Sequence, residues 1–143
     1  MSRIIKFRGL SAKGVFIYGG FSYLEGVKDT YICRFGVTQP DMETGHQDNY
    51  IEPVPVDFKT IGQFTGLLDK NGKEIYEGDV LEWEHQQDKI CYVKIFWSDE
   101  DYLGWHFLDN FGNYVENDIS LKFSHVIGNI HEDKHLIEQR KGE

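Results

Sequence analysis

Two histidines and a glutamate near the end of the chain have the spacing of a metal-dependent hydrolase. His131, Glu132 and His135 satisfy H-E-x-x-H, in which two His one helical turn apart bind zinc and the Glu activates water. That chemistry needs a buried helix and a third ligand, whereas this segment follows the strand-like run Val126 to Ile130 and is rich in charge. We therefore expect a solvated helix start with no resident metal or other cofactor, where His131 and His135 bind metal only adventitiously.

A group of acids in the middle of the chain offers a second possible chemistry, because paired carboxylates can act as general acid and base. These acids are Glu74, Glu77, Asp79, Glu82 and Glu84. No nucleophile, histidine or metal-ligand set stands at a recognisable spacing beside them. We interpret them as turn and solvent-facing strand residues, with Asp79 accepting backbone N–H bonds in its own turn. No catalytic residue is assigned, and we expect a protein that is not an enzyme.

The elements that carry these acids are joined by two sharp turns. Asn71-Gly72 supplies residues that tolerate a positive φ, so we predict a hairpin there, and a second break follows at Gly78. After it, apolar residues alternate with acids from Val80 to Glu84, the pattern of a half-buried strand.

The segment QFTGLLDKNGKEIYEGDVLEW, residues 63 to 83, resembles the YopX family of bacteriophage and prophage proteins, whose hallmark reads approximately Q-[FY]-T-G-L-x-D-x-N-G-x-x-I-[YF]-E-G-D. Two further pieces agree: IKFRG at residues 5 to 9 with VFIYGGF at 15 to 21, and VIGNIHEDKHLIE at 126 to 138. The chain departs from the family at Leu68 and in the variable stretch from Val37 to Asp57. The resemblance implies a small, mainly β phage protein with an SH3-like barrel in its second half and a poorly defined activity.

We expect a mainly β fold: a smaller β-rich N-terminal lobe, a partly open SH3-like barrel in the C-terminal half and a short C-terminal helix over Glu132 to Arg140. The lobe spans residues 1–56 and ends in a long loop, 37–56, because Pro40, Pro53 and Pro55 interrupt it. The barrel domain spans residues 57–143. Its core is expected to include Trp105, Phe107 and one face of the strand from Ile90 to Trp97. The other predicted strands are Ile4–Arg8, Val15–Tyr18, Thr30–Phe35, Ile61–Thr65, Val80–Glu84, Gly104–Leu108 and Ser124–Ile130.

Charge is distributed unevenly along the chain. Residues 1–60 hold seven Lys/Arg and seven Asp/Glu, whereas residues 61–143 hold eight against seventeen, so the net charge of -9 lies in the second part. Such an acidic surface disfavours nucleic acid, whose binding depends on neutralised phosphates. The alternatives are a nucleic-acid-associated role, with the basic residues Arg3, Lys6, Arg8 and Lys13 touching phosphate, and an acidic DNA mimic that inhibits a host nucleic-acid enzyme. The preferred interpretation is that these four basic side chains lie on the solvent face of a first strand.

Aromatic residues make up 15% of the chain, which is more than one small barrel can enclose. We expect some to cover the other lobe, a second subunit or a peptide, so partner-binding candidates are Tyr92, Phe96, Tyr102, Tyr114 and Phe123. The expected partners are further copies of the chain and an unidentified host or phage protein.

The compartment is inferred from the cysteines and from hydropathy. Cys33 and Cys91 form no CxxC pair, no secretory signal or Asn-x-Ser/Thr sequon is present, and no apolar run approaches the length of a membrane span. We expect the two thiols to be free and buried, and the protein to work in the cytoplasm of a bacterial host, away from the membrane.

Overall fold

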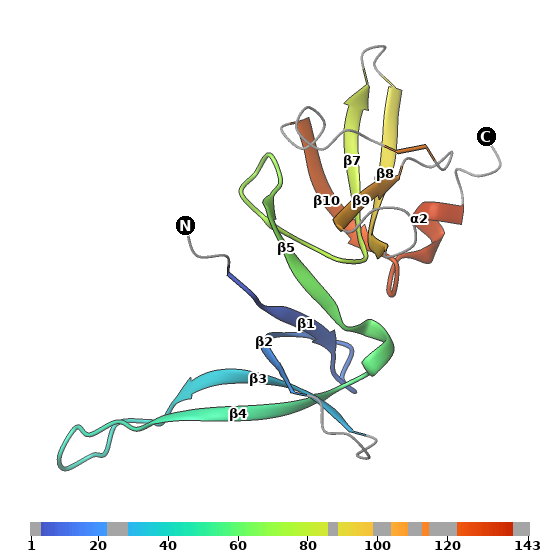
Figure 1. Cartoon of the computed structure of the whole chain (residues 1–143). Coiled ribbons are helices and arrows are strands. Elements are labelled where there is room, and N and C mark those ends of the chain that lie inside the picture. Colours follow the sequence, from blue (N-terminus) through green and yellow to red (C-terminus); the bar gives the residue numbers. More distant parts are fainter. Residues whose placement is uncertain are drawn as a thin grey trace. The chain divides into compact units, whose positions relative to one another are not determined.

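The computed structural model describes residues 4–22, 29–85, 89–98, 104–108, 113–114 and 123–138. Strands dominate this part and pair antiparallel throughout, which confirms the mainly β prediction (Figure 1). The chain forms two compact units, Ile4–Gln63 and the unit that runs from Phe64 onward. We had expected the first lobe to end at residue 56, whereas the structure divides the chain between Gln63 and Phe64. Within the described residues no helix is both long and apolar enough to cross a membrane.

The first unit is an antiparallel sheet in the order β4-β3-β2-β1-β5. Its elements are β1 (Phe7–Leu10), β2 (Phe16–Ser22), β3 (Thr30–Val37), β4 (Asn49–Val56), the 3-10 helix η1 (Phe58–Thr60) and the start of β5 (Gly62–Leu68). The apolar cluster of Ile17, Ile32 and Val56 forms its core, and Phe7, Phe21, Val54 and Ile61 pack around it. Burying these side chains together is what holds the small sheet.

The prediction of a long loop over residues 37–56 is wrong. Residues 49–56 form β4, which pairs with the whole of β3 from Thr30 opposite Val56 to Val37 opposite Asn49. The prolines mislead because they interrupt most strands. Here β4 is the outermost strand of the sheet, and Pro53 and Pro55 stand at alternate positions. The backbone nitrogens of both prolines face the unpaired side of β4. Their missing N–H groups therefore remove no hydrogen bond between β4 and β3.

The second unit contains the rest of β5, β6 (Glu74–Tyr76), β7 (Asp79–His85), β8 (Lys89–Ser98), β9 (Gly104–Leu108), β10 (Ser124–Asn129) and α2 (Lys134–Glu138). Four strands form one sheet in the order β10-β7-β8-β9, which is not closed in the described residues. Ile75, Leu81 and Phe107 form the core, with Leu67, Trp105 and Val126 packed on it. The predicted core positions Trp105 and Phe107 and the short C-terminal helix are thus confirmed.

The two predicted turns are also confirmed. Gly72 and Gly78 have φ of 78° and 86°, which an L side chain rarely adopts. In the second turn the carboxylate of Asp79 accepts the N–H of Tyr76 at 2.8 Å, as expected for a turn residue.

The first turn is held by Asp69, whose side chain is buried. One carboxylate oxygen accepts the N–H groups of Asn71 and Lys73, both at 2.9 Å. The other accepts the N–H of Val126 in β10, also at 2.9 Å. A further bond, from the Lys70 N–H to the Ser124 carbonyl at 2.9 Å, fixes the same two segments. One carboxylate therefore closes the hairpin and attaches it to a strand more than fifty residues later.

Replacing Asp69 by Asn is expected to lower the free energy of unfolding by about 2 kcal/mol, because the amide offers one acceptor oxygen where the carboxylate offers two charged ones. Urea unfolding followed by fluorescence measures the change. Asp41→Asn is the matched control, since Asp41 also accepts two backbone N–H groups but is exposed. Equal effects of the two substitutions would contradict the role given to Asp69.

The same carboxylate predicts acid sensitivity. Burial by itself raises the pKa of Asp69. The N–H groups of Val126, Lys73 and Asn71 and the charge of Lys73 together lower it by more than burial raises it, so the net pKa lies below the ordinary value. A group with a depressed folded-state pKa stabilises fully above its unfolded pKa of about 4 and loses that contribution as the pH falls through the folded value. The stability difference between the parent chain and Asp69→Asn should therefore shrink below pH ~4 and stay constant above pH ~5. Urea midpoints between about pH 7 and about pH 2.5 test this.

Candidate interaction surface on the hairpin arm

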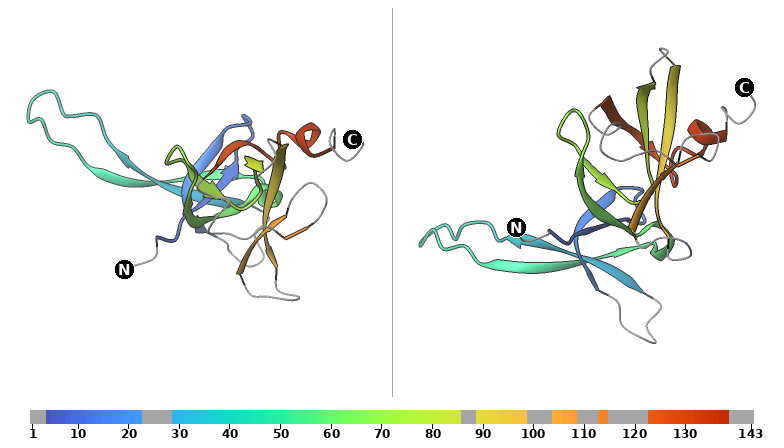
Figure 2. Two further views of the ribbon diagram at one scale, coloured as in Figure 1. Left: turned by 90° about the horizontal axis from the view of Figure 1, so that it is seen from above. Right: turned by 45° about the horizontal axis from the view of Figure 1, so that its top comes forward.

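The hairpin of β3 and β4 forms an arm, which we define as residues Thr30 to Val56. Its two strands pair over eight residues each, and the loop 38–48 closes the far end. Only its base pairs with β2, through Tyr31, Ile32 and Cys33. The far half projects beyond β1 and β2 of its own unit (Figures 1 and 2). The far half of the arm consequently exposes both faces of a two-stranded ribbon.

One face, the inner face, continues the core of the first unit and then becomes polar. At the base, Ile32 and Val56 are buried. Further out, the Arg34 Nε donates to a Glu52 carboxylate oxygen at 2.6 Å, directly across the ladder. This bond raises the pKa of Arg34 and lowers that of Glu52. Both side chains are about half exposed, so the pair orders the arm more than it stabilises it.

The end of the inner face needs a glycine. A Cβ built on Gly36 would lie 2.4 Å from the Tyr50 ring, because that ring covers Gly36 from the opposite strand. An aromatic ring over a cross-strand glycine stabilises a ribbon that has little other cover.

The opposite face, the outer face, has no charged residue among its strand positions, although at its base the Tyr31 hydroxyl lies 3.5 Å from the exposed Asp29 carboxylate. Strand alternation places eight residues on it, and they pair across the ladder as Tyr31 with Pro55, Cys33 with Pro53, Phe35 with Ile51, and Val37 with Asn49. Phe35 and Ile51 stand directly opposite each other and are each 71% exposed, and Val37 is 49% exposed. In a chain with 27% charged residues, strand positions without charge and with their largest apolar side chains in solvent make this face a candidate contact surface.

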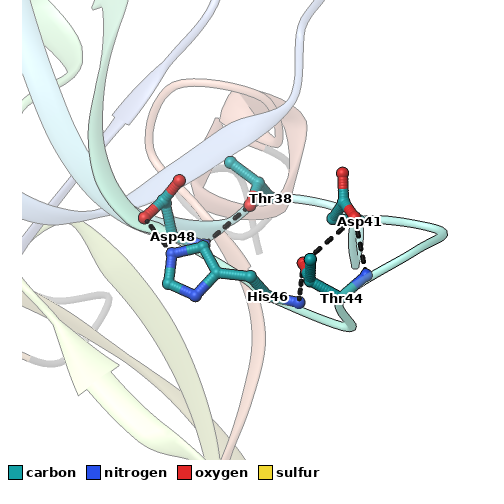
Figure 3. Close-up of polar contacts among 5 residues, drawn as sticks. All are labelled: Thr38, Asp41, Thr44, His46 and Asp48. Carbon is teal, nitrogen blue, oxygen red and sulfur yellow. Dashed lines mark hydrogen bonds and ion pairs between the residues drawn. The ribbon is translucent and has the colours of Figure 1, made fainter.

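The tip of the arm is ordered by its own polar side chains, labelled in Figure 3. Asp41 accepts the N–H groups of Glu43 and Thr44 and the Thr44 hydroxyl, at 2.8 to 3.0 Å. The N–H of Thr44 contributes most to lowering the pKa of Asp41. Thr38 accepts the N–H of Asp48 at 2.8 Å, and His46 Nε2 lies 2.9 Å from the Asp48 carboxylate. These bonds fix an acidic tip that also presents Met42, which is fully exposed.

The partner-binding candidates predicted from the sequence belong to the second unit and are distant from the arm in sequence. Tyr114 and Phe123 are 62% and 61% exposed, and the Tyr114 ring lies 5.5 Å from that of His106. Tyr92 and Phe96 belong to β8, but their side chains lie outside the described residues, as does Tyr102 entirely. Two of the five are therefore seen to be accessible, and whether they bind a partner stays a prediction.

The four basic candidates do not form one solvent face. Arg8 is only 5% exposed, and its guanidinium lies 4.4 Å from the centre of the Phe16 ring. Lys6 is partly buried and Lys13 is exposed, while Arg3 lies outside the described residues. The expectation of a solvent-facing row is wrong for Arg8, because its long side chain lies over an aromatic ring of the neighbouring strand.

The H-E-x-x-H residues are arranged by a turn rather than by a helix. α2 begins at Lys134, so His131 precedes it and does not share a helical face with His135. The side chain of Asn129 orders this turn: its oxygen accepts the N–H groups of His131 and Glu132, both at 3.0 Å, and its amide donates to Glu132 at 3.2 Å. No cluster of three or more His, Cys, Asp or Glu suited to a metal occurs in the described residues.

Comparison with known proteins decides the family. The YopX protein family matches residues 6–138. The chain belongs to that family. A crystal structure of protein EF1440 from Enterococcus faecalis is similar at a TM-score of 0.58 and 24% sequence identity, covering 95% of this chain and 99% of the other. That likeness concerns the fold alone. A search of curated proteins finds no match.

The YopX hallmark segment has structural roles at nearly every described position. Thr65 donates to the Ile75 carbonyl at 2.8 Å, Ile75 and Tyr76 are core residues, and Asp69 and Asp79 bond backbone N–H groups. The hallmark, residues 63 to 83, therefore specifies the second unit, whereas the arm lies outside this segment.

The outer face depends on β4, which the prediction of a loop over residues 37–56 leaves out. A signal was present: Cys33, Phe35 and Val37 alternate with Arg34 and Gly36, and Ile51, Pro53 and Pro55 alternate with Glu52 and Val54. Allowing proline in an edge strand would have matched the two patterns as a hairpin.

Two isoleucines of the arm give a direct test of this surface. Ile32→Ala, on the inner face, should cost about 3 kcal/mol because it leaves a cavity in the core, whereas Ile51→Ala should change stability by less than ~0.5 kcal/mol. Thermal and urea unfolding measure both. Retention on a hydrophobic column should fall for Ile51→Ala in the native state. A large loss of stability with Ile51→Ala would show that the outer face is covered within the molecule.

Proposed function

We propose that this YopX-family chain is a non-catalytic accessory protein of a phage or prophage that works in the bacterial cytoplasm through protein–protein contacts and self-association. The observation that carries the proposal is the outer face of the arm. Phe35 and Ile51 are exposed to solvent on a face with no charged residue among its strand positions. Side chains of this kind gain free energy only when another surface covers them, at about 25 cal/mol per Å² of apolar area.

The absence of an enzymatic role is supported by what the acids do. Asp69 and Asp79 are buried and bonded to backbone N–H groups, and Glu74 accepts the Tyr76 hydroxyl at 2.9 Å. Carboxylates held in this way act as fixed acceptors that order turns. They are poorly suited to giving and taking protons in a reaction.

We further propose that the second unit is a partly open barrel of the SH3-like kind. Its four antiparallel strands and the register shift between Val126 and Gly128 in β10 support a bent sheet.

A second candidate function, the acidic DNA mimic, is favoured by the concentration of the whole net charge in residues 61–143. Such a protein would bind a nucleic-acid enzyme of the host and not DNA, and its binding would weaken steeply with salt. The nucleic-acid-associated alternative loses support because Arg8 is buried.

Sedimentation equilibrium tests the self-association directly. We expect the parent chain to associate at micromolar concentration, because one ribbon face offers an interface at the low end of known sizes. Phe35→Ser combined with Ile51→Ser should shift the midpoint of association at least about tenfold upward without changing stability. Tyr114→Ser combined with Phe123→Ser is the matched control on the second unit. A parent chain that stays monomeric up to about 100 µM would contradict the proposed self-association.

A further inference from the structure

We propose that Asn71-Gly72 is a site of spontaneous deamidation that the turn around Asp69 protects. A chain that opens at this turn is converted to an isoaspartyl form that no longer closes it. The site belongs to the second unit, so it is independent of the outer face of the arm and of the proposed self-association.

Asn71-Gly72 is the one Asn-Gly pair in the chain, and its reactivity differs from that of the other asparagines. The backbone nitrogen after an asparagine can attack the side-chain amide carbon, and a bulky side chain on the next residue hinders that approach. Gly72 has no side chain. Both residues are exposed, and no atom of the described residues lies within 4 Å of the point where a Cβ on Gly72 would stand. Water and dissolved base therefore reach this pair.

The reaction needs only water and a base. The Gly72 nitrogen gives up its proton and forms a bond to Asn71 Cγ, and the bond from Cγ to Nδ2 breaks as ammonia leaves with a proton from water. Water then opens the resulting succinimide ring at either carbonyl, which gives an aspartyl or an isoaspartyl residue. Overall, one amide and one water become one carboxylate and one ammonium ion, with no oxidation or reduction.

Hydrogen bonds, rather than burial, oppose this reaction in the folded chain. The Gly72 N–H donates to the Asp69 carbonyl at 3.0 Å, so the proton that must leave is held within the turn. The Asn71 N–H donates to the Asp69 carboxylate at 2.9 Å, which fixes the main chain on the other side of the asparagine. Attack on Cγ requires the main chain between these two groups to rotate. The reaction therefore requires the turn to open first.

The turn is also anchored to a distant strand, which makes opening rare. The second oxygen of Asp69 accepts the Val126 N–H at 2.9 Å, and the Lys70 N–H donates to the Ser124 carbonyl at 2.9 Å. Opening the turn breaks these bonds to β10 as well. An exposed pair is thus protected by the stability of the unit that surrounds it, rather than by that of its own loop.

The isoaspartyl product does not fit the same turn. Its main chain runs through Cβ and Cγ, which adds one atom between the nitrogens of residue 71 and Lys73. Those two N–H groups donate to one oxygen of Asp69, each at 2.9 Å, so the longer chain disturbs a shared bond. The former main-chain carbonyl also becomes a carboxylate in the same turn as the buried Asp69 carboxylate, and like charges are unfavourable there. A transient opening is therefore made permanent.

Peptide mapping by mass spectrometry tests the protection on the parent chain alone. The chain is incubated at mildly alkaline pH in native buffer and in guanidinium chloride, with ionic strength matched by sodium chloride. We expect deamidation at Asn71 to be at least about tenfold slower in the folded chain. Asn49, which is exposed and followed by Tyr50, is the internal control and should react slowly in both states. Equal rates at Asn71 would overturn the protection, and an unreactive Asn71 in denaturant would overturn the site.

The Asp69→Asn variant tests the cause of the protection. In native buffer, with circular dichroism showing that the chain is folded, this variant should deamidate at residue 71 at least about fivefold faster than the parent chain. Asp41→Asn is the matched control, because Asp41 orders the tip of the arm in the same way and should leave the rate unchanged. Equal rates for the two variants would overturn the role of the Asp69 carboxylate. The comparison in denaturant stands even if Asp69→Asn does not fold.

The modified chain itself tests the consequence. The isoaspartyl form can be separated from the parent chain by anion exchange, since it carries one more negative charge. It should unfold at a lower urea concentration than Asn71→Asp, which has the added charge without the longer main chain. Equal urea midpoints for these two forms would contradict the claim that the lengthened main chain prevents the turn from closing.

Discussion

The buried carboxylate of Asp69 is the interaction on which the second unit depends. Burying a charged carboxylate is costly unless its oxygen atoms accept hydrogen bonds. The Asp69 carboxylate accepts three, all from backbone N–H groups. Two of them close its own turn and the third belongs to β10. The bond therefore converts a local reversal into a long-range connection, and the depressed pKa shows that the folded state favours the ionised form.

This constraint explains why the family hallmark says so little about activity. A turn that needs Asp, Asn and Gly at fixed positions, followed by a second turn with a buried Asp79, leaves few residues in the segment that are free to do chemistry. In the first unit the constraints are weaker beyond the base of the arm. There the ladder itself, the Arg34–Glu52 pair and the Tyr50 ring over Gly36 hold the ribbon, so its outer face can be used for contact.

The sequence predicted the second unit better than the first, for reasons visible in single residues. Asn71-Gly72 and Gly78 need a positive φ, which few residues supply, so their turns can be located from residue types alone. Pro53 has no N–H, so whether it ends a strand depends on whether a neighbouring strand requires a donor at that position. The strand order decides this, and no local pattern states it. Arg8 shows the same limit, because only the pairing of β1 with β2 brings Phe16 beneath its guanidinium.

The acidic second part of the chain and the apolar outer face of the arm have opposite effects on contact between copies. Acidic surfaces keep copies of a protein apart at long range, since repulsion between them acts over about 8 Å at physiological salt. Apolar contact acts only once the surfaces touch. The self-association proposed above is therefore expected to use a face whose strand positions carry no charge.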